Sequence, residues 1–351
     1  MEALKNNFMR ILIIQTAFLG DAILTLPMIM KLKERYPESV IDVLAIPSTA
    51  SIFYAAPYVD NVFIIDKKGL HKGIIGMNKF IEELKLNLYS TVYSPHRSFR
   101  SAYITLRLGA GESYGFDNSS LKYAYKNVVK YEAQHHEVSR NLSLIDEDVS
   151  DNQWKILPRI NFAEEDKVNV SKILSLYKLE DKFISVAPGS VWQTKRYPKE
   201  NVIDLIKKLI DIGENLVLIG GEEDKLLCSE VVANCNNNIV NLAGELSVTE
   251  TVYLLKHSKL LITNDSAPTH LGMCADIPVL TIYCSTIPEF GFYPYNTKSD
   301  FISYNGLKCK PCGIHGFSEC PIKTFDCGIK LLPEEVFKAV INMINKKMGD
   351  G

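Results

Sequence analysis

The chain has 351 residues, which exceeds one typical α/β domain and suffices for two. Hydrophobic residues make up 46% and charged residues 23%, values typical of a folded globular protein and not of a disordered one. A formal net charge of -2 argues against binding to nucleic acid, which generally requires a basic surface. Any anionic ligand must therefore be held by local groups.

The apolar segment 11–30 raises the question of an export signal. It is interrupted by Asp21 and Pro27, and no small-residue cleavage site follows, so a buried strand and helix explain it better. No other stretch reaches the roughly 18 uninterrupted apolar residues of a membrane span. We therefore expect a cytoplasmic protein.

Short apolar runs alternate with longer stretches of helical periodicity, which is the pattern of βαβ units and a parallel sheet. In the first half, strands are predicted at residues 11–14, 40–46, 62–65 and 90–94, with helices up to residue 36 and at 78–86 and 99–108. The pattern then blurs between residues 122 and 181, which we interpret as the region between two domains.

A second βαβ series follows. Its predicted strands are residues 183–187, 216–219, 260–263 and 279–282, and its predicted helices are residues 198–212 and shorter segments beginning at 222 and 268. Residues 333–348 have the proline start, acidic first turn and basic end of an amphipathic helix. The expected fold class is therefore α/β, with Rossmann-like parallel-sheet domains at residues 1–155 and 180–330 and a terminal helix within residues 331–351.

The first strand-to-helix junction contains Gly20 and Asp21. Ligands of such sheets bind beyond the carboxyl ends of the strands, which makes Asp21 a candidate for chemistry. Position alone favours a simpler alternative, in which Asp21 caps the helix and contributes about 1 kcal/mol. No G-x-G-x-x-G or Walker A loop occurs, which argues against a dinucleotide oxidoreductase and a P-loop kinase.

The loop at residues 188–198 combines a Gly-Ser turn with cations. Backbone amides near Ser190 and the ammonium of Lys195 suit a phosphate group, although a solvated loop is the alternative. Residues 264–270 place Asp265, Ser266, Thr269 and His270 at the start of a helix, where free amides can hold a diphosphate. His270 either reaches the same anion or is a satisfied buried histidine.

Two further clusters are candidate binding sites. Gly220 and Gly221 follow a strand and precede Glu222 to Asp224, which suits close backbone approach and a carboxylate bound to ribose hydroxyls; helix capping competes with this interpretation. In the first half, a helix start carries a basic cluster that can bind an acidic acceptor, or can simply be a solvated face. The members of this cluster are His96, Arg97 and Arg100.

Eight cysteines without an export signal are expected to be thiols or metal ligands rather than a disulfide framework. Four of them, Cys228, Cys235, Cys274 and Cys284, lie in apolar surroundings typical of a core. The others, Cys309, Cys312, Cys320 and Cys327, could hold a structural zinc ion. We expect no metal there and favour reduced thiols or disulfides, because the last two cysteines do not form a second close pair.

Taken together, these motifs resemble the ADP-heptose:lipopolysaccharide heptosyltransferase family, glycosyltransferase family 9. The resemblance rests on Gly-Asp with Thr-Leu-Pro at 25–27, Pro-Gly-Ser-x-Trp-x-x-Lys-Arg-x-Pro at 188–198, Gly-Gly at 220–221 and Asn-Asp-Ser-x-x-x-His at 264–270. It spans most of the chain. The sequence departs from the best-known members at Ser266-Ala267-Pro268 and in its C-terminal cysteines, so the donor sugar and the acceptor stay open.

The resemblance implies a GT-B fold, in which the two Rossmann-like domains face a central cleft and the terminal helix packs back on the first domain. It implies that Asp21 is the catalytic base and that the donor is held by Gly20, Ser190, Lys195, Gly220, Gly221, Asp224, Asp265, Ser266, Thr269 and His270. The acceptor would contact His96, Arg97 and Arg100. The implied reaction is inverting transfer of heptose from ADP-heptose to the lipopolysaccharide inner core, without a metal or other cofactor and with peripheral contact at the inner membrane.

Two rival functions remain at this point. A nucleotide-sugar epimerase of the same fold would turn over donor without any acceptor, and a non-catalytic binding module would tolerate loss of Asp21. A transferase using another nucleotide sugar is the nearest variant of the main prediction.

Overall fold

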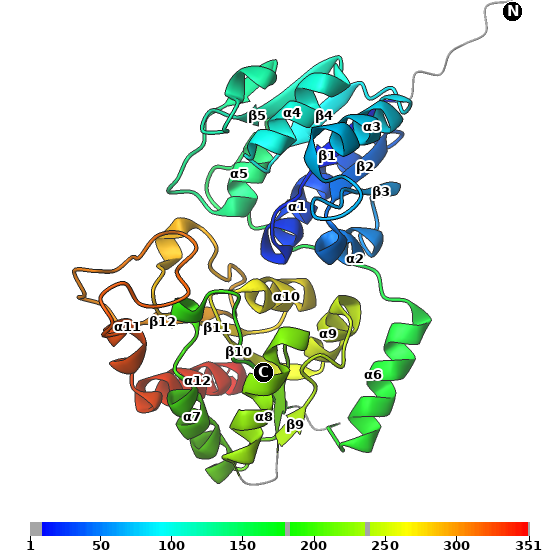
Figure 1. Ribbon diagram of the computed structural model, residues 1–351. Coiled ribbons are helices and arrows are strands. Elements are labelled where there is room, and N and C mark those ends of the chain that lie inside the picture. Colours follow the sequence, from blue (N-terminus) through cyan, green and yellow to red (C-terminus); the bar gives the residue numbers. More distant parts are fainter. Residues whose placement is uncertain (1–8, 180–182, 236–238, 350–351) are drawn as a thin grey trace, which may run out of the picture. The chain divides into compact units, whose positions relative to one another are not determined.

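The computed structural model describes residues 9–179, 183–235 and 239–349 (Figure 1). The chain divides into two compact units, Met1–Asn161 and Phe162–Gly351. The predicted region between domains is therefore wrong as a separate segment, since residues up to 161 belong to the first unit and a helix at Glu164–Leu176 belongs to the second. Residues 180 and 181, at the end of that region, lie outside the described residues.

The first unit is built on a six-stranded parallel sheet in the order β3-β2-β1-β4-β5-β6. Its strands are β1 (Arg10–Ile14), β2 (Val40–Ala45), β3 (Asn61–Ile64), β4 (Thr91–Ser94), β5 (Glu112–Phe116) and β6 (Asn127–Val129). The apolar runs at β1 and β2 are buried on both faces, as parallel sheets require.

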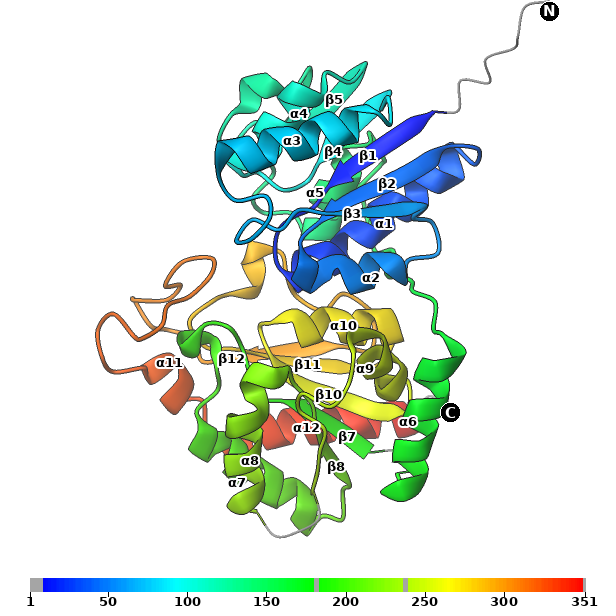
Figure 2. The same ribbon diagram turned by 45° about the vertical axis from the view of Figure 1, so that its right-hand side comes forward.

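Helices cover both faces of this sheet (Figure 2). They are α1 (Leu19–Arg35), α2 (Ala50–Tyr54), α3 (Gly73–Lys85), α4 (Phe99–Leu108) and α5 (Glu137–Ser143), with short 3-10 turns η1 (Pro47–Thr49) and η2 (Lys122–Ala124). Helices α3 and α4 pack on the face that carries Leu12 and Ile14 of β1. Helix α5 packs against α1 on the other face, so residues around the start of α1 are brought next to the start of α5.

The second unit repeats the architecture with strand order β12-β11-β10-β7-β8-β9, also parallel. Its strands are β7 (Phe183–Ala187), β8 (Leu216–Leu218), β9 (Ile239–Asn241), β10 (Ser258–Asn264), β11 (Val279–Tyr283) and β12 (Asp300–Ser303). Its helices are α6 (Glu164–Leu176), α7 (Lys199–Asp211), α8 (Lys225–Ala233), α9 (Val248–Leu255), α10 (Ala267–Ala275), α11 (Asp326–Ile329) and α12 (Pro333–Gly349), with 3-10 turns η3 (Gln193–Lys195), η4 (Glu222–Asp224) and η5 (Pro288–Phe290).

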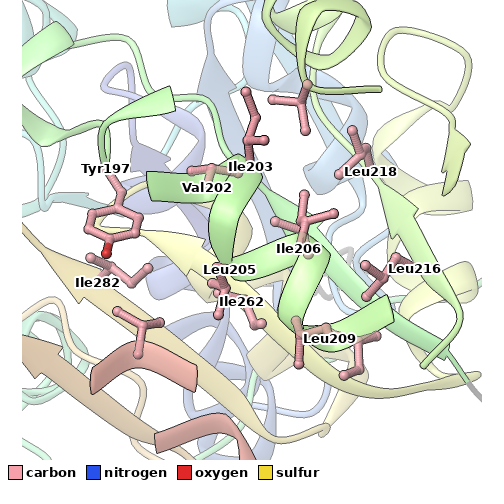
Figure 3. Close-up of a cluster of buried hydrophobic side chains, with 14 of the residues drawn as sticks. Tyr197, Val202, Ile203, Leu205, Ile206, Leu209, Leu216, Leu218, Ile262 and Ile282 are labelled. Carbon is pink, nitrogen blue, oxygen red and sulfur yellow. The ribbon is translucent and has the colours of Figure 1, made fainter. Parts of the chain in front are cut away.

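One core cluster of the second unit joins α7 to the sheet (Figure 3). Leu205, Ile206 and Leu209 of α7 meet Leu216 and other aliphatic residues of the strands, and all of these are essentially inaccessible to solvent. The helical spacing of the α7 residues and the alternation in the strands place both apolar faces against each other.

Both sheets follow the same path. The chain begins in a central strand, builds outward on one side, then returns to the neighbouring central position and builds outward on the other side. The strand order therefore reverses between β1 and β4 in the first unit and between β7 and β10 in the second. Such switch points are where open α/β sheets bind ligands, beyond the carboxyl ends of the strands. The predicted α/β class with two Rossmann-like parallel-sheet units is confirmed.

The terminal helix differs from the prediction. Val336 and Val340 of α12 are fully buried in the core of the second unit, and α12 packs against α7. Lys208 of α7 and Glu334 of α12 also form an ion pair at 2.9 Å. The amphipathic pattern was recognisable, but it does not specify which core receives the apolar stripe.

No described helix combines the length and apolarity needed to cross a lipid bilayer.

The position of α12 makes a stability prediction. We expect Val336→Ala to lower the free energy of unfolding by about 1–3 kcal/mol, because it removes buried methyl groups and leaves a cavity. The control is Val191→Ala, since Val191 is 65% exposed, and its effect should stay within about 0.5 kcal/mol. Urea titration followed by circular dichroism measures both, and equal effects would contradict the assigned packing of α12.

Candidate functional site

The loops after β7 and β10 meet at the switch point of the second sheet, and the side chain of Asn264 joins them. Its Nδ2 donates to the Pro188 carbonyl oxygen at 2.7 Å, and its Oδ1 accepts from the Tyr197 N–H at 2.9 Å. Asn264 is buried at the end of β10. The amide thus satisfies backbone groups of the β7 loop and fixes that loop against β10.

Lys195 and Asp265, which the sequence predicts in two separate motifs, form an ion pair at this point. The distance from Lys195 Nζ to Asp265 Oδ2 is 2.7 Å, and both side chains are largely buried. Thr286 Oγ1 donates to the same carboxylate oxygen at 2.7 Å. Because an ammonium group carries three N–H donors, a lysine oriented by one carboxylate can also hold an anion.

His270 lies in the second turn of α10 and is buried beside this pair. Burial lowers its pKa to about 4, with Asp265 opposing and Lys195 reinforcing the shift. In this structure the imidazole is therefore neutral at neutral pH. Within the described residues its Nδ1 has no hydrogen-bond partner, which leaves a buried polar atom available to a ligand.

The first turn of α10 offers fewer donors than the sequence predicts. Pro268 has no N–H, and the Thr269 N–H donates to the Ser266 carbonyl at 3.1 Å. The Thr269 side chain is fully buried and bonds to the Asn264 carbonyl oxygen and to Thr281. The polar groups of Thr269, a predicted donor-binding residue, thus bond within the core. Ser266 remains at the N-cap of α10 and is partly exposed.

Asp224 closes the other side of the β7 loop. A Cβ at Gly189 would lie 2.0 Å from Asp224 Oδ1, and one at Gly220 would lie 2.7 Å from Asp224 Cβ, so both glycines are needed for this close approach. Asp224 Oδ2 accepts from the Gly221 N–H at 3.0 Å. Its Oδ1 is buried without a described partner, and burial raises the pKa of the carboxyl. A ligand hydroxyl is the natural donor for such an oxygen.

Two smaller features shape the same edge. Ser190 is 9% exposed, and its carbonyl oxygen accepts from Arg196 Nε at 2.7 Å, which turns the Arg196 side chain along the loop. On α10, a Cβ at Gly272 would lie 2.4 Å from Val279 Cγ2 of β11, so the helix rests directly on the sheet. The middle of α10 is thereby held against the sheet.

In the first unit, Asp21 is the third residue of α1, and the N-cap is Phe18. Asp21 is therefore not the N-cap itself, although a carboxylate in the first turn stabilises the start of the helix. Gly20 precedes it as the second residue of the helix and is half-buried. Asp21 is partly exposed, so its carboxylate is compatible with a role toward a ligand.

The helix α5 adds a buried carboxyl beside Asp21. Glu137, the first residue of α5, pairs with Arg140 at 2.7 Å, and both are nearly inaccessible. Burial raises the pKa of Glu137 to about 7; Arg140 opposes this shift and the charge of Asp21 reinforces it. The Arg97 guanidinium lies 4.2 Å from the ring centroid of Tyr131. Arg140 also lies over this ring and donates to the Tyr131 hydroxyl oxygen, so Tyr131 links the two arginines. Asp21 thus belongs to a network of two carboxyls and two guanidiniums.

His96 connects two loops at the switch point of the first unit, as Asn264 does in the second unit. His96 Nδ1 lies 2.8 Å from Thr16 Oγ1 and 3.1 Å from Ser101 Oγ, which connects the loops after β1 and β4. Burial lowers the pKa of His96 to about 4, and the charges of Lys67 and Arg97 add to the effect. His96 is therefore neutral and mainly structural, so direct contact with an acceptor is not its evident role.

Sequence reasoning missed Lys67, which follows β3. Its Nζ donates to the Thr16 carbonyl oxygen at 2.8 Å, and burial together with the charge of Arg100 lowers its pKa to about 8. Lys67, Arg97 and Arg100 thus gather positive charge beyond the strand ends of the first sheet. The only sequence signal was a charged residue directly after an apolar run, which is too common to be specific.

The model of glycosyltransferase family 9 (heptosyltransferase) matches residues 77–322. The chain belongs to glycosyltransferase family 9. It is therefore a glycosyltransferase, and its two units are those of the GT-B fold.

Relatives and solved structures of this family cover most of the chain. Lipopolysaccharide heptosyltransferase 2 of Escherichia coli (strain K12) is 27% identical over 296 residues, covering 80% of this chain and 84% of its own. Lipopolysaccharide heptosyltransferase 3 of the same strain is 26% identical over 277 residues, covering 76% and 80%. Among solved structures, E. coli ADP-heptose LPS heptosyltransferase II has a TM-score of 0.78 at 23% identity, covering 97% and 100%. The family 9 glycosyl transferase of Veillonella parvula DSM 2008 has a TM-score of 0.85 at 21% identity, covering 98% and 99%.

In this glycosyltransferase the loop that carries Cys309, Cys312 and Cys320 bonds to the turn η3, which contains Lys195. The Phe317 N–H donates to Thr194 Oγ1 at 2.8 Å, the Thr194 N–H donates to the Phe317 carbonyl oxygen at 3.1 Å, and the Cys312 N–H donates to the Ser285 carbonyl oxygen at 2.9 Å. The four cysteines of this region are free thiols, and no metal-holding group of three or more His, Cys, Asp or Glu side chains occurs among the described residues. The loop therefore contributes through backbone contacts that the cysteine spacing did not reveal.

The buried neutral state of His270 makes a pH prediction. An ordinary pKa of 6.5 in the unfolded chain against about 4 in the folded one means that the unfolded state binds the proton more readily. Stability is thus fully present above pH 6.5 and is lost as the pH falls toward 4. We expect the free energy of unfolding of the native protein to drop by on the order of 3 kcal/mol more than that of His270→Gln over this range. His96 shifts in the same direction and Glu137 in the opposite one, so only the difference between the two proteins is diagnostic. Parallel pH profiles in urea titrations would contradict the neutral assignment.

Proposed function

We propose that this glycosyltransferase moves heptose from ADP-heptose to the inner core of lipopolysaccharide, with inversion at the anomeric carbon and without a metal ion. The observation that carries the proposal is the Lys195–Asp265 pair at the switch point of the second sheet, in a chain of family 9. The curated relatives are lipopolysaccharide heptosyltransferases, and one structural neighbour is named for ADP-heptose. These names support the choice of donor and acceptor.

Asp21 acts as the catalytic base in this proposal. Its carboxylate takes the proton of an acceptor hydroxyl while that oxygen attacks the anomeric carbon of the donor, and the bond from that carbon to the diphosphate breaks on the opposite face. One carbon–oxygen bond forms as another breaks, and ADP leaves with the electron pair. The neighbouring charges of Glu137, Arg97 and Arg140 set the local field in which Asp21 works.

Negative charge grows on the diphosphate as ADP leaves, and the second unit supplies groups to stabilise it. Lys195 provides a cation already oriented by Asp265, so little reorganisation is needed during the reaction. The neutral imidazole of His270 and the start of α10 at Ser266 add dipoles rather than charge. The unpartnered oxygen of Asp224 suits a ribose hydroxyl, and Gly189, Gly220 and Gly221 allow the nucleotide close to the backbone.

The first unit holds the acceptor. Arg97 and Arg100, with the half-buried Lys67, face the acidic groups of an inner core, and His96 positions their loop. An acceptor that carries lipid would bring the enzyme to the inner face of the inner membrane, as a cytoplasmic protein in peripheral contact. The reaction needs no further cofactor, because the cation and the base both come from side chains.

Removal of the base is the first test. We expect Asp21→Asn to lower acceptor-dependent release of ADP from ADP-heptose by about 10²–10⁴-fold. The donor KM should change little, because the carboxylate accepts the acceptor's proton in the transition state and does not bind the donor. Asp60→Asn is the matched control, since Asp60 lies at the far edge before β3 and bonds the Ile41 N–H. Native-like activity of Asp21→Asn would refute the assigned role.

Substitution of either Lys195 or Asp265 should lower kcat, because the two side chains act as a pair. We expect Lys195→Gln to reduce kcat by about 10²–10³-fold, as loss of a preorganised group at the leaving charge does, and Asp265→Asn to give a smaller loss by releasing Lys195. Lys208→Gln removes an exposed lysine from α7 and should leave kcat unchanged. A double variant of Lys195 and Asp265 that loses the product of the two single factors would show that the pair does not act as a unit.

The same assay separates the rivals. ADP release that requires heptose-deficient core supports transfer, whereas turnover of the donor alone with retention of the nucleotide indicates an epimerase. Reaction with other nucleotide sugars but not with ADP-heptose would keep the family and overturn the heptose assignment. No turnover with any donor would favour a binding module.

A further inference from the structure

Three large apolar side chains stand exposed at one end of α3. Leu70 precedes the helix, and Ile74 and Ile75 lie in its first turn, with exposed fractions of 85%, 69% and 88%. The other face of the same helix buries Met77, Phe80 and Ile81 in the core of the first unit. The exposed isoleucines are therefore additional to the residues that hold the helix on the sheet, and folding of the unit does not require them to be apolar.

The segment that carries Leu70 is folded back onto the helix. The Asp66 carboxylate accepts from the Lys68 and Gly69 N–H groups at 3.0 and 2.8 Å, and the Asp66 N–H donates to His71 Nδ1 at 2.9 Å. A Cβ at Gly76 would lie 2.8 Å from the Leu70 carbonyl oxygen. Leu70 is thus held next to the first turn of α3, and all three apolar side chains are exposed at this end of the helix. We call this surface, Leu70 with Ile74 and Ile75, the α3 tip.

Positive charge surrounds the α3 tip. Lys68, Lys72 and Lys79 are exposed around it, and none of them has a salt bridge within the described part of the chain. The nearest acidic group in sequence, Asp66, is already turned to the backbone amides of its own loop. Glu82, two turns along α3, is paired with Lys85 and Arg107. Glu83 is also exposed on α3, but Lys68 and Lys72 lie nearer the tip, so its rim is basic on balance.

The neighbouring helix extends the same character. Helix α4 packs beside α3, where Tyr103 donates to Asn78 Oδ1 at 2.9 Å. Its exposed apolar residues are Phe99 and Leu106, at 58% and 53%, and its Arg107 is partly exposed. Apolar side chains among lysines and arginines over two helices are the composition of a surface that enters the headgroup region of an anionic bilayer.

We propose that the α3 tip and its lysine rim dock the first unit onto a lipid bilayer that carries anionic headgroups. This inference rests on the proposed function only in that a lipid-carrying acceptor makes such a surface useful. Apolar side chains would enter the interface while the lysine ammonium groups reach the headgroup phosphates. A second copy of the chain is the competing occupant, but a two-fold contact would bring two lysine rims face to face without countercharge.

Vesicle co-sedimentation of the full chain tests the proposal, with no donor or acceptor present. We expect the native protein to bind phosphatidylcholine vesicles that contain phosphatidylglycerol, to bind pure phosphatidylcholine vesicles far more weakly, and to be released by salt. Ile74→Ser with Ile75→Ser should weaken binding at least about tenfold, and Lys68→Gln with Lys72→Gln should remove most of the preference for anionic lipid.

The matched control replaces two equally exposed apolar residues of the second unit, Leu176→Ser on α6 and Leu226→Ser on α8, each 73% exposed in the native protein. It should bind vesicles like the native protein. Loss of binding in this control, native binding in the Ile74/Ile75 variant, or no vesicle binding by the native protein would each overturn the proposal. So would a dimer in light scattering that the Ile74/Ile75 substitutions dissociate.

The assay is independent of catalysis. The Ile74/Ile75 variant should keep native circular dichroism and native turnover of a delipidated acceptor, since these residues lie outside the proposed binding groups. A protein that binds vesicles without transferring heptose would refute the proposed function and leave the docking surface intact. A transferase that ignores anionic vesicles would do the reverse.

Discussion

Loops beyond the ends of parallel strands carry polar groups that no neighbouring strand can satisfy, and at each switch point one polar side chain joins two such loops. In the second unit the Asn264 amide bonds the loop after β7 from both of its polar atoms. In the first unit His96 connects the loops after β1 and β4 through Thr16 and Ser101. Lys195 and Asp265 sit on the loops that Asn264 joins, and Arg97 sits on the loop that carries His96.

The two sites distribute charge differently. In the second unit a single cation, Lys195, is matched by a single carboxylate, Asp265, in a largely buried setting. An incoming diphosphate therefore meets a cation that is already desolvated and directed, and the cost of arranging it is met when the protein folds. In the first unit Asp21 shares its surroundings with Glu137, Arg97 and Arg140, and its charge adds to the burial that raises the pKa of Glu137.

The sequence predicted the central strands well because β1, β2, β7 and β10 are long apolar runs. It missed β5 and the edge strands β6, β9 and β12, which are short or partly polar and whose pairing depends on tertiary contacts. The motifs identified Lys195 and Asp265 as candidate site residues but not their ion pair, because a sequence gives no distances between loops. Thr269 looked like a donor-site residue although it faces the core, and Lys67 has no motif at all. Its relevance comes only from where β3 ends.

Gly272 connects the interior of the second unit with its surface chemistry. With no side chain at this position, α10 rests on Val279 of β11, and the start of the helix stays level with Asp265 and Lys195. A larger side chain at residue 272 would clash with Val279 and push α10 away from the sheet. The shift at the binding edge would occur without any change to a polar residue. Gly272 is therefore constrained by the position of the polar residues at the binding edge as well as by the packing of the core.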